Sequence, residues 1–565
     1  MNTMKRKTIL LLSAAAMVVL TGCSGKLGAL SADNFKVTPK PMEVHAGHVQ
    51  VTTNGLFPEK YMKRNAVVTV TPELRYQTAN GPVVARGIPA TFQGERVLGN
   101  DQTISYLLGG HYTLKSDFAY VPDMQQSELY MTFDARVGNK VVEVPAVKVA
   151  DGVIATAELY RRALATGNLS LAVDSFQRIT RMRQDANIKF LIQQAELRKS
   201  ELQNNSVSEF VALLKRINAD RESFNLNNIE VSAYASPDGG YRLNEALASR
   251  REAAAEGYVR QQMRGADLTA PVNAHYTAQD WEGFQQLVRA SNIQDKEVIL
   301  RVLSMYEDPE EREQQIKNMS EGFRELADGI LPELRRARLS VNYEVIGRDD
   351  NQIQEQLRTE ASQLSLEEML YAATLQPTLA EQAAVYQQTA RLYPADCRAV
   401  NNLAVVQYAQ GHAAEALQTL ERARQMDAAN PDVNANLGLL ALLNGDVSAA
   451  ENYIGRASGA SRQGEVLGTL HMAQGNYALA AQDFGYTNSN SAALAEILNN
   501  DYAKAARTLK AIKNPDGLTD YLQAILNQRQ GNSDAAASFL RSALQKDPSL
   551  ATYAERDLEL KSLVQ

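Results

Sequence analysis

The chain has 565 residues, of which 45% are hydrophobic and 22% charged, so it can form several folded cores and is not a disordered protein. Its 58 basic and 65 acidic residues leave a formal net charge of −7 without a dense basic stripe, which argues against a nucleic-acid partner. Two cysteines and six scattered histidines do not make a disulfide framework or a multi-cysteine zinc site, and we expect neither a metal nor another cofactor.

Residues 1–22 have the pattern of a signal peptide, in which three basic residues precede an apolar run from Thr8 to Leu20 that is too short to span a membrane comfortably. The sequence Leu20-Thr21-Gly22-Cys23 resembles a bacterial lipobox, in which the signal is removed before the cysteine and lipid is attached to it. We therefore expect a lipid anchor on Cys23 and a short tether over residues 23–33. The alternative is an ordinary signal peptide followed by an incidental cysteine.

Residues 34–150 alternate between apolar and polar positions. Val67–Val70, Leu129–Phe133 and Val141–Val144 are short runs rich in Val, Thr and Tyr, and Gly, Pro and Asn turns separate such runs. This pattern predicts a β-sandwich-like domain. Nothing in it points to a ligand.

From about residue 155 the apolar spacing becomes helical, and we predict a helical connector over residues 151–184. A second helix is expected over 206–219. A strand follows at 229–234, where Ile, Val and Ala alternate with polar residues, and the turn at 236–240 leads into another helix. A strand–turn–helix of this kind commonly carries a ligand site in its loop.

The stretch from Ile229 to Gly240, followed by Asn244, Leu247 and Arg251, resembles the OmpA-like peptidoglycan-binding domain. The segment Leu334–Tyr343, which begins with a basic pair, is similar to the closing element of that family. The resemblance covers residues 185–347 and implies an α/β domain with an insertion at about 265–330.

The resemblance also implies a ligand, the diaminopimelate part of the peptidoglycan stem peptide. In the family one Asp holds the ammonium group and one Arg holds the carboxylate through a two-pronged contact. The Arg position is Arg251 here, whereas the Asp position is Ser236, which carries no charge. Asp238 is a possible substitute two residues later. The candidate peptidoglycan-binding residues are Ser236, Asp238, Asn244, Arg251 and Arg335.

Two plainer interpretations stay open for these residues. Arg251 could form an ion pair on a helix surface, which contributes about 0–1 kcal/mol. Gly239 and Gly240 could serve only the geometry of the turn.

Residues 348–363 are polar and are interpreted as a linker, and residues 364–565 are rich in Ala, Leu and Gln. Four positions recur after 34 residues, and shortened or weaker copies follow. These positions are Leu403, Gly411, Ala416 and Ala423, and then Leu437, Gly445, Ala450 and Ala457. This recurrence resembles a tetratricopeptide array, a helical solenoid whose concave face usually binds protein segments. The alternative is a spacer that only sets a distance.

The sequence lacks a Gly-x-Ser-x-Gly elbow, a His-Glu-x-x-His pair, a phosphate-binding Gly-Lys-Ser/Thr loop and an EF-hand loop, so we expect no catalytic residues. The sequence predicts a multidomain α+β protein, and its resemblances imply a non-enzymatic outer-membrane lipoprotein of Bacteroidota type. It would hold peptidoglycan and recruit envelope proteins on the periplasmic face, as an accessory part of an assembly or secretion machine. The alternatives are a surface-exposed fimbrial or adhesion component and a cell-wall hydrolase.

Overall fold

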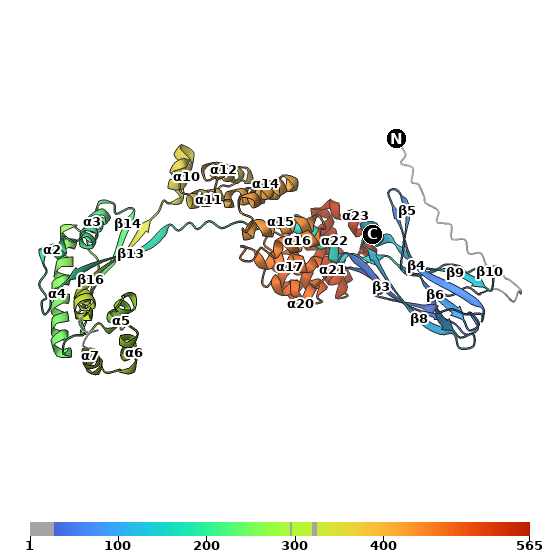
Figure 1. The fold of residues 1–565 in the computed structure, drawn as a ribbon. Helices are drawn as coiled ribbons and strands as arrows, with labels where there is room; N and C mark the ends of the chain where they lie inside the picture. Colours follow the sequence, from blue (N-terminus) through green and yellow to red (C-terminus); the bar gives the residue numbers. More distant parts are fainter. Residues whose placement is uncertain (1–26, 294–295, 319–324, 565) are drawn as a thin grey trace, which may run out of the picture. The chain divides into compact units, whose positions relative to one another are not determined.

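The computed structural model describes residues 27–293, 296–318 and 325–564 (Figure 1). Cys23 and the predicted signal peptide lie outside the described residues. The chain forms two compact units. Unit 1 combines Met1–Val173 with Gln376–Gln565, and unit 2 is Asp174–Leu375, so unit 2 is inserted between two parts of unit 1.

The N-terminal part of unit 1 is a domain of two sheets. The first sheet has β1 (Phe35–Thr38), β2 (Met42–His45), β3 (His48–Phe57), β8 (Gly110–Ala119) and β12 (Val153–Ile154). The second has β4 (Ala66–Thr78), β5 (Gly81–Arg86), β6 (Ala90–Gly94), β7 (Gln102–Ile104), β9 (Glu128–Val137), β10 (Lys140–Glu143) and β11 (Val147–Asp151).

Both sheets share one hydrophobic core, as in a β-sandwich. Every second residue of β3 and β8 is buried, and Val49 and Phe57 of the first sheet belong to the same cluster as Val68 and Leu129 of the second. The predicted runs Val67–Val70 and Leu129–Phe133 lie in β4 and β9, and Val141–Val144 lies in β10 except for its last residue. The alternation in the sequence therefore has its expected cause, which is that one face of each sheet packs against the other.

The prediction of a helical connector over 151–184 is wrong for most of that segment. A helix, α1, covers only Leu159–Ala165 after a short turn of 3-10 helix at Thr156–Glu158. Residues 166–178 run as irregular chain, and strand β13 begins at Ile179. Contacts with distant parts of the chain override the local helical spacing here.

The C-terminal part of unit 1 is helical and repetitive. Its helices are α12 (Leu379–Leu392), α13 (Arg398–Ala409), α14 (Ala413–Met426), α15 (Pro431–Leu443), α16 (Val447–Ile454), α17 (Gln463–Ala473), α18 (Tyr477–Asp483), α19 (Asn490–Leu498), α20 (Tyr502–Ala511), α21 (Gly517–Arg529) and α22 (Ser533–Lys546). From α13 onward consecutive helices form helical hairpins, each joined by a short turn. The first hairpin is α13 and α14, and the last is α21 and α22.

The recurring small residues have a packing role. Ala416, Ala450, Ala480 and Ala536 all have 0% exposure in the core of the array, where paired helices approach closely. The glycines before the second helix of these pairs adopt positive φ, for example +85° at Gly411. This conformation is open to glycine at little cost. In the weaker copy, Asn500 takes the same place with φ +61°.

Unit 2 contains a four-stranded sheet in the order β13-β16-β14-β15. The strands are β13 (Ile179–Lys189), β14 (Phe224–Tyr234), β15 (Val272–Thr277) and β16 (Arg336–Ile346). β14 is parallel to β15, and β16 is antiparallel to both β13 and β14. Helices α3 (Asn205–Ala219) and α4 (Tyr241–Gly265) contribute Phe210, Leu214 and Val259 to its core.

Three predicted boundaries in unit 2 differ from the structure. The sheet domain begins with β13 at Ile179 instead of 185, and β15 lies inside the predicted insertion but pairs with β14. The predicted linker contains a helix, α10 (Asp350–Glu360), because Asp349 caps it and Ile353 is buried. Helix α11 (Leu366–Thr374), which was predicted to open the repeat array, is assigned to unit 2.

The helices after β15 form a small core of their own. Residues of this core come from α5 (Trp281–Ala290), α6 (Lys296–Met305), the π-helix Leu326–Ile330 and α9 (Leu331–Leu334), and α7 (Pro309–Asn318) packs beside α6. Phe284, Val288, Ile299 and Leu303 are buried in this cluster. In the described part of the chain, no helix combines the length and apolar character needed to cross a membrane.

Candidate functional site

The inner face of the repeat array holds a segment of the same chain. α1 packs against α15, α17 and α19, the first helices of three successive pairs; we call the surface formed by α13, α15, α17 and α19 the groove. Leu159, Tyr160, Ala163 and Leu164 of α1 are buried in the same hydrophobic cluster as the array. The connector is therefore a part of the array core.

Beyond α1 the connector is held through its main chain by three asparagines. The Ser170 amide donates to Asn436 Oδ1 at 2.6 Å, and the Ser170 carbonyl accepts from Asn401 Nδ2 at 3.1 Å and from Asn436 Nδ2 at 2.8 Å. The Ala172 amide donates to Asn402 Oδ1 at 2.8 Å, and Asn402 Nδ2 donates to the Ala172 carbonyl at 2.9 Å. An amide side chain can satisfy both groups of one residue because it carries a donor and an acceptor.

The side chain of Ser170 has polar partners of its own. Its hydroxyl donates to Asp432 Oδ1 at 2.6 Å and lies 2.8 Å from the hydroxyl of Ser461. Ser461 also contacts the main chain of the segment, since its hydroxyl donates to the Leu171 carbonyl at 2.6 Å. Asp432, with 7% exposure, thus faces donors on both the segment and the array.

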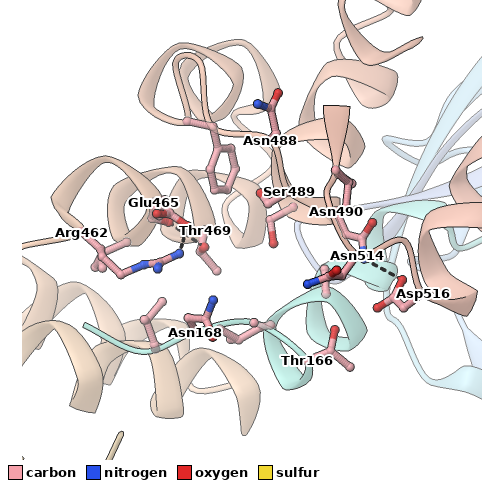
Figure 2. Close-up of a pocket in the computed structure, with 18 of the residues that line it drawn as sticks. Thr166, Asn168, Arg462, Glu465, Thr469, Asn488, Ser489, Asn490, Asn514 and Asp516 are labelled. Atoms are coloured by element: carbon pink, nitrogen blue, oxygen red, sulfur yellow. Dashed lines mark hydrogen bonds and ion pairs between the residues drawn. The ribbon is translucent and has the colours of Figure 1, made fainter. Parts of the chain in front are cut away.

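A polar cavity of about 540 Å³ remains beside this segment (Figure 2). Thr166 and Asn168 of the connector form one wall, and Arg462, Thr469 and Asn514 belong to the array side. The array residues Asn490 and Asp516 are joined by a hydrogen bond of 3.0 Å. The occupied part of the groove thus borders an open, amide-lined part.

In unit 2 four of the five predicted site residues are in contact. Asp238 accepts from the Ser236 hydroxyl and forms an ion pair with Arg335 at 3.2 Å. Arg335 Nε also lies 3.3 Å from the Ser236 hydroxyl oxygen. Asn244 Nδ2 donates to the carbonyls of Ser236 at 2.9 Å and Gly239 at 2.8 Å and so holds the turn. The charged side chains keep a small exposed fraction, 18% for Asp238 and 13% for Arg335.

Arg251, the fifth residue, is turned inward. It has 0% exposure, and its guanidinium donates to the carbonyls of Gln194 at 3.0 Å, Tyr234 at 2.9 Å and Leu191 at 3.2 Å. Burial is the main reason that the pKa of Arg251 is lowered, to about 10, and the charge of Arg335 adds to it. The alternative of a surface ion pair is therefore wrong, and in this structure the group holds backbone in place of a ligand.

Sequence reasoning missed several polar groups beside these sites. Arg336 forms an ion pair with the buried Asp280 at 3.0 Å, next to the predicted cluster. In the groove, Asn402 and Asn436 occupy equivalent repeat positions 34 residues apart, so the repeat offset could have found them. Asn401 has Ala435 at the equivalent position and gave no such signal.

Within the described ranges, no cluster of three or more His, Cys, Asp or Glu side chains could hold a metal ion. Cys397 is buried in the array at the start of α13, and burial raises the pKa of its thiol to about 11. A buried thiol of this kind is a poor nucleophile at neutral pH.

Residues 407–471 match the family model of a tetratricopeptide repeat. The C-terminal helical region thus carries tetratricopeptide repeats, in a protein of mixed α and β structure whose sheets are N-terminal to that region. No curated protein matches the chain.

Three solved structures illustrate the similarity. A tetratricopeptide repeat protein from Parabacteroides merdae is 15% identical with a TM-score of 0.28, over 38% of this chain and 91% of that one. PilF of Pseudomonas aeruginosa is 17% identical with a TM-score of 0.27, over 35% and 95%. One chain in the structure of the APC/C hetero-tetramer Cut9–Hcn1 is 12% identical with a TM-score of 0.31, over 58% of this chain and 76% of that one.

Proposed function

We propose that this protein is a non-enzymatic scaffold of a bacterial cell envelope. Lipid on Cys23 would anchor it in the outer membrane on the periplasmic face, unit 2 would act as an OmpA-like domain that holds peptidoglycan, and the repeats would engage other envelope proteins. Such a scaffold would serve as an accessory part of an assembly or secretion machine. Proteins with tetratricopeptide repeats commonly bind protein partners, which supports the last of these roles.

The observation that carries the peptidoglycan role is the Asp238–Arg335 pair. Diaminopimelate presents an ammonium and a carboxylate on one carbon, so a ligand of this kind can take both charges of an existing ion pair. Asp238 would receive the ammonium, and Arg335 would receive the carboxylate in a two-pronged contact. The pair is only partly exposed, so both interactions would be less screened than on an open surface.

Binding to isolated sacculi tests this role. Asp238→Asn and Arg335→Gln remove one charge each, and we expect each to lower co-sedimentation with sacculi at least about tenfold in affinity, the usual cost of losing one charge-assisted contact. Arg260→Gln is the matched control, because Arg260 forms an exposed ion pair with Glu256 on α4. Undiminished binding of both site variants would remove the peptidoglycan role, and release of soluble muropeptides by the purified protein would favour a hydrolase.

The anchor and partner roles have separate tests. Cys23→Ala should move the protein from the detergent-rich to the aqueous phase in a detergent partition experiment. Purification of the native protein in mild detergent should retain specific envelope proteins. Protease treatment of intact cells should leave it uncut, whereas cleavage would favour a surface-exposed adhesion component.

A further inference from the structure

The segment Thr166–Val173 follows α1 without forming a helix or a strand, and part of it is buried in the groove. Leu169, Ser170 and Ala172 have exposures of 2%, 0% and 4%, whereas Leu171 has 42% and Val173 has 64%. From Ser170 to Val173 buried and exposed residues alternate, as in a bound peptide that directs one set of side chains to its site and the other to solvent, and Leu169 is buried beside Ser170.

The groove binds this segment mainly by hydrogen bonds to the main chain of the segment. The amide and the carbonyl of both Ser170 and Ala172 are bonded by Asn401, Asn402 and Asn436. The Ser170 side chain is fully buried and hydrogen-bonds to the carboxylate of Asp432 and the hydroxyl of Ser461, and the Leu169 side chain is buried in the hydrophobic cluster of the array.

We propose that Thr166–Val173 is a built-in ligand of a peptide site on the repeat array, and that it keeps this site closed to other proteins. The ligand class is an extended segment with serine at the position of Ser170, an apolar residue before it and a small residue two positions after it. This inference deepens the proposed partner-binding role, because it states which segments the array accepts and what blocks them.

Covalent attachment explains why the site is closed. A tethered segment competes at an effective concentration in the millimolar range, so a free segment of equal intrinsic affinity binds only weakly. α1 adds to this advantage, since its apolar residues are buried in the same core immediately upstream of the segment. Release of the segment is then required before a partner segment can occupy the asparagines.

Peptide binding to the full-length protein tests the proposal. The probe is a fluorescent peptide with the sequence of residues 166–175, titrated with the protein by anisotropy. The wild type should not bind it. Ser170→Asp places a second carboxylate against buried Asp432, should expel the segment and should therefore expose a binding site for the probe. Leu171→Asp is the matched control, because Leu171 points to solvent, and it should behave as the wild type.

A second change identifies the site. Adding Asn436→Ala to Ser170→Asp should weaken probe binding at least about tenfold, because it removes partners of two main-chain groups. Probe binding by the wild type equal to that of Ser170→Asp, or a folded Ser170→Asp protein that ignores the probe, would overturn the proposal. Both results leave the peptidoglycan and pull-down experiments unaffected, so failure here is distinct from failure of the proposed function.

Hydrogen exchange on the wild type decides the question if Ser170→Asp does not fold. The amides of Ser170 and Ala172 should exchange as slowly as those of α13 and α15, although they lie in irregular chain. Exchange as fast as in the exposed turn between β9 and β10 would mean that the segment leaves the groove readily, and the proposal would then be wrong.

Discussion

Replacing Arg251 with alanine should destabilise unit 2 rather than remove a ligand contact alone. The guanidinium is fully buried, and it donates three hydrogen bonds to main-chain carbonyls of the segment after β13 and the end of β14. It also lies 5.1 Å from the centre of the Phe190 ring. It therefore ties one of these segments to the other.

The size of the effect follows from these contacts. Each buried carbonyl left without a donor costs about 1–3 kcal/mol. In the wild type, the cost of burying the guanidinium charge offsets part of the stability that the three hydrogen bonds contribute. A net loss of about 3–5 kcal/mol is expected for Arg251→Ala. Arg251→Lys keeps the charge but cannot reach three carbonyls at once, so it should lose roughly half as much.

Urea unfolding measures this loss within unit 2 alone. Trp281 is the single tryptophan of the chain and lies in α5, so its fluorescence reports the unfolding of this unit. With an m-value of about 2–3 kcal/mol per molar urea, the midpoint should fall by about 1–2 M. Arg250→Ala is the control, because the neighbouring Arg250 is exposed and bonds only to a carbonyl of its own helix.

One result would refute this reasoning. If Arg251→Ala unfolds at the wild-type urea concentration and yet loses binding to sacculi, the guanidinium contacts the ligand and does not support the fold. Asp238→Asn is the cleaner probe of binding, because that carboxylate is partly exposed and its loss leaves the three carbonyl contacts of Arg251 in place.

Three further predictions concern unit 1. Ala416→Leu should lower the free energy of unfolding of unit 1 by about 1–3 kcal/mol, because it overpacks a fully buried position. Ala428→Leu is the control at an exposed position and should leave this free energy unchanged. Calorimetry measures the free energy of unfolding of both variants. Burial raises the pKa of Asp557 from 3.8 to about 6, so the folded state binds this proton more tightly than the unfolded state. The free energy of unfolding should therefore fall by about 3 kcal/mol between about pH 4 and pH 6, and Asp557→Asn should abolish this part of the pH dependence in pH-dependent urea titrations. In the Cys23→Ser protein, the Cys397 thiol should react with iodoacetamide at least about a hundredfold more slowly in the folded protein than in urea, because it is buried with a pKa of about 11. Mass spectrometry measures both rates. Equal rates would mean that the start of α13 opens readily.

Regular elements with a repeating contact were predictable from the sequence. Ala416 and Ala450 mark positions where paired helices approach, and the same contact recurs in each pair, so the residue recurs as well. The strands of the N-terminal domain were visible for a related reason, since each of them buries one face in a shared core. In both cases the periodicity of the helix or strand decides which positions are buried, and apolar or small residues recur at those positions.

The site in unit 2 was predictable only in part. The turn after β14 and the basic pair at the start of β16 are local patterns, and the sheet order brings them together at Ser236, Asp238 and Arg335. The direction of Arg251 was not predictable, because it depends on carbonyls at Leu191 and Gln194, which no side-chain pattern marks.

The path of the connector was decided by tertiary structure alone. Its local spacing favours helix, but beyond α1 the asparagines of the groove hold Ser170 and Ala172 in irregular chain. Hydrogen bonds to main-chain groups require little of the side chains in the bound segment, so its sequence carries almost no trace of them. Patterns of side chains thus determined the repeats and the sheets, whereas the occupant of the groove was settled by hydrogen bonds between its main chain and asparagine side chains more than 200 positions away.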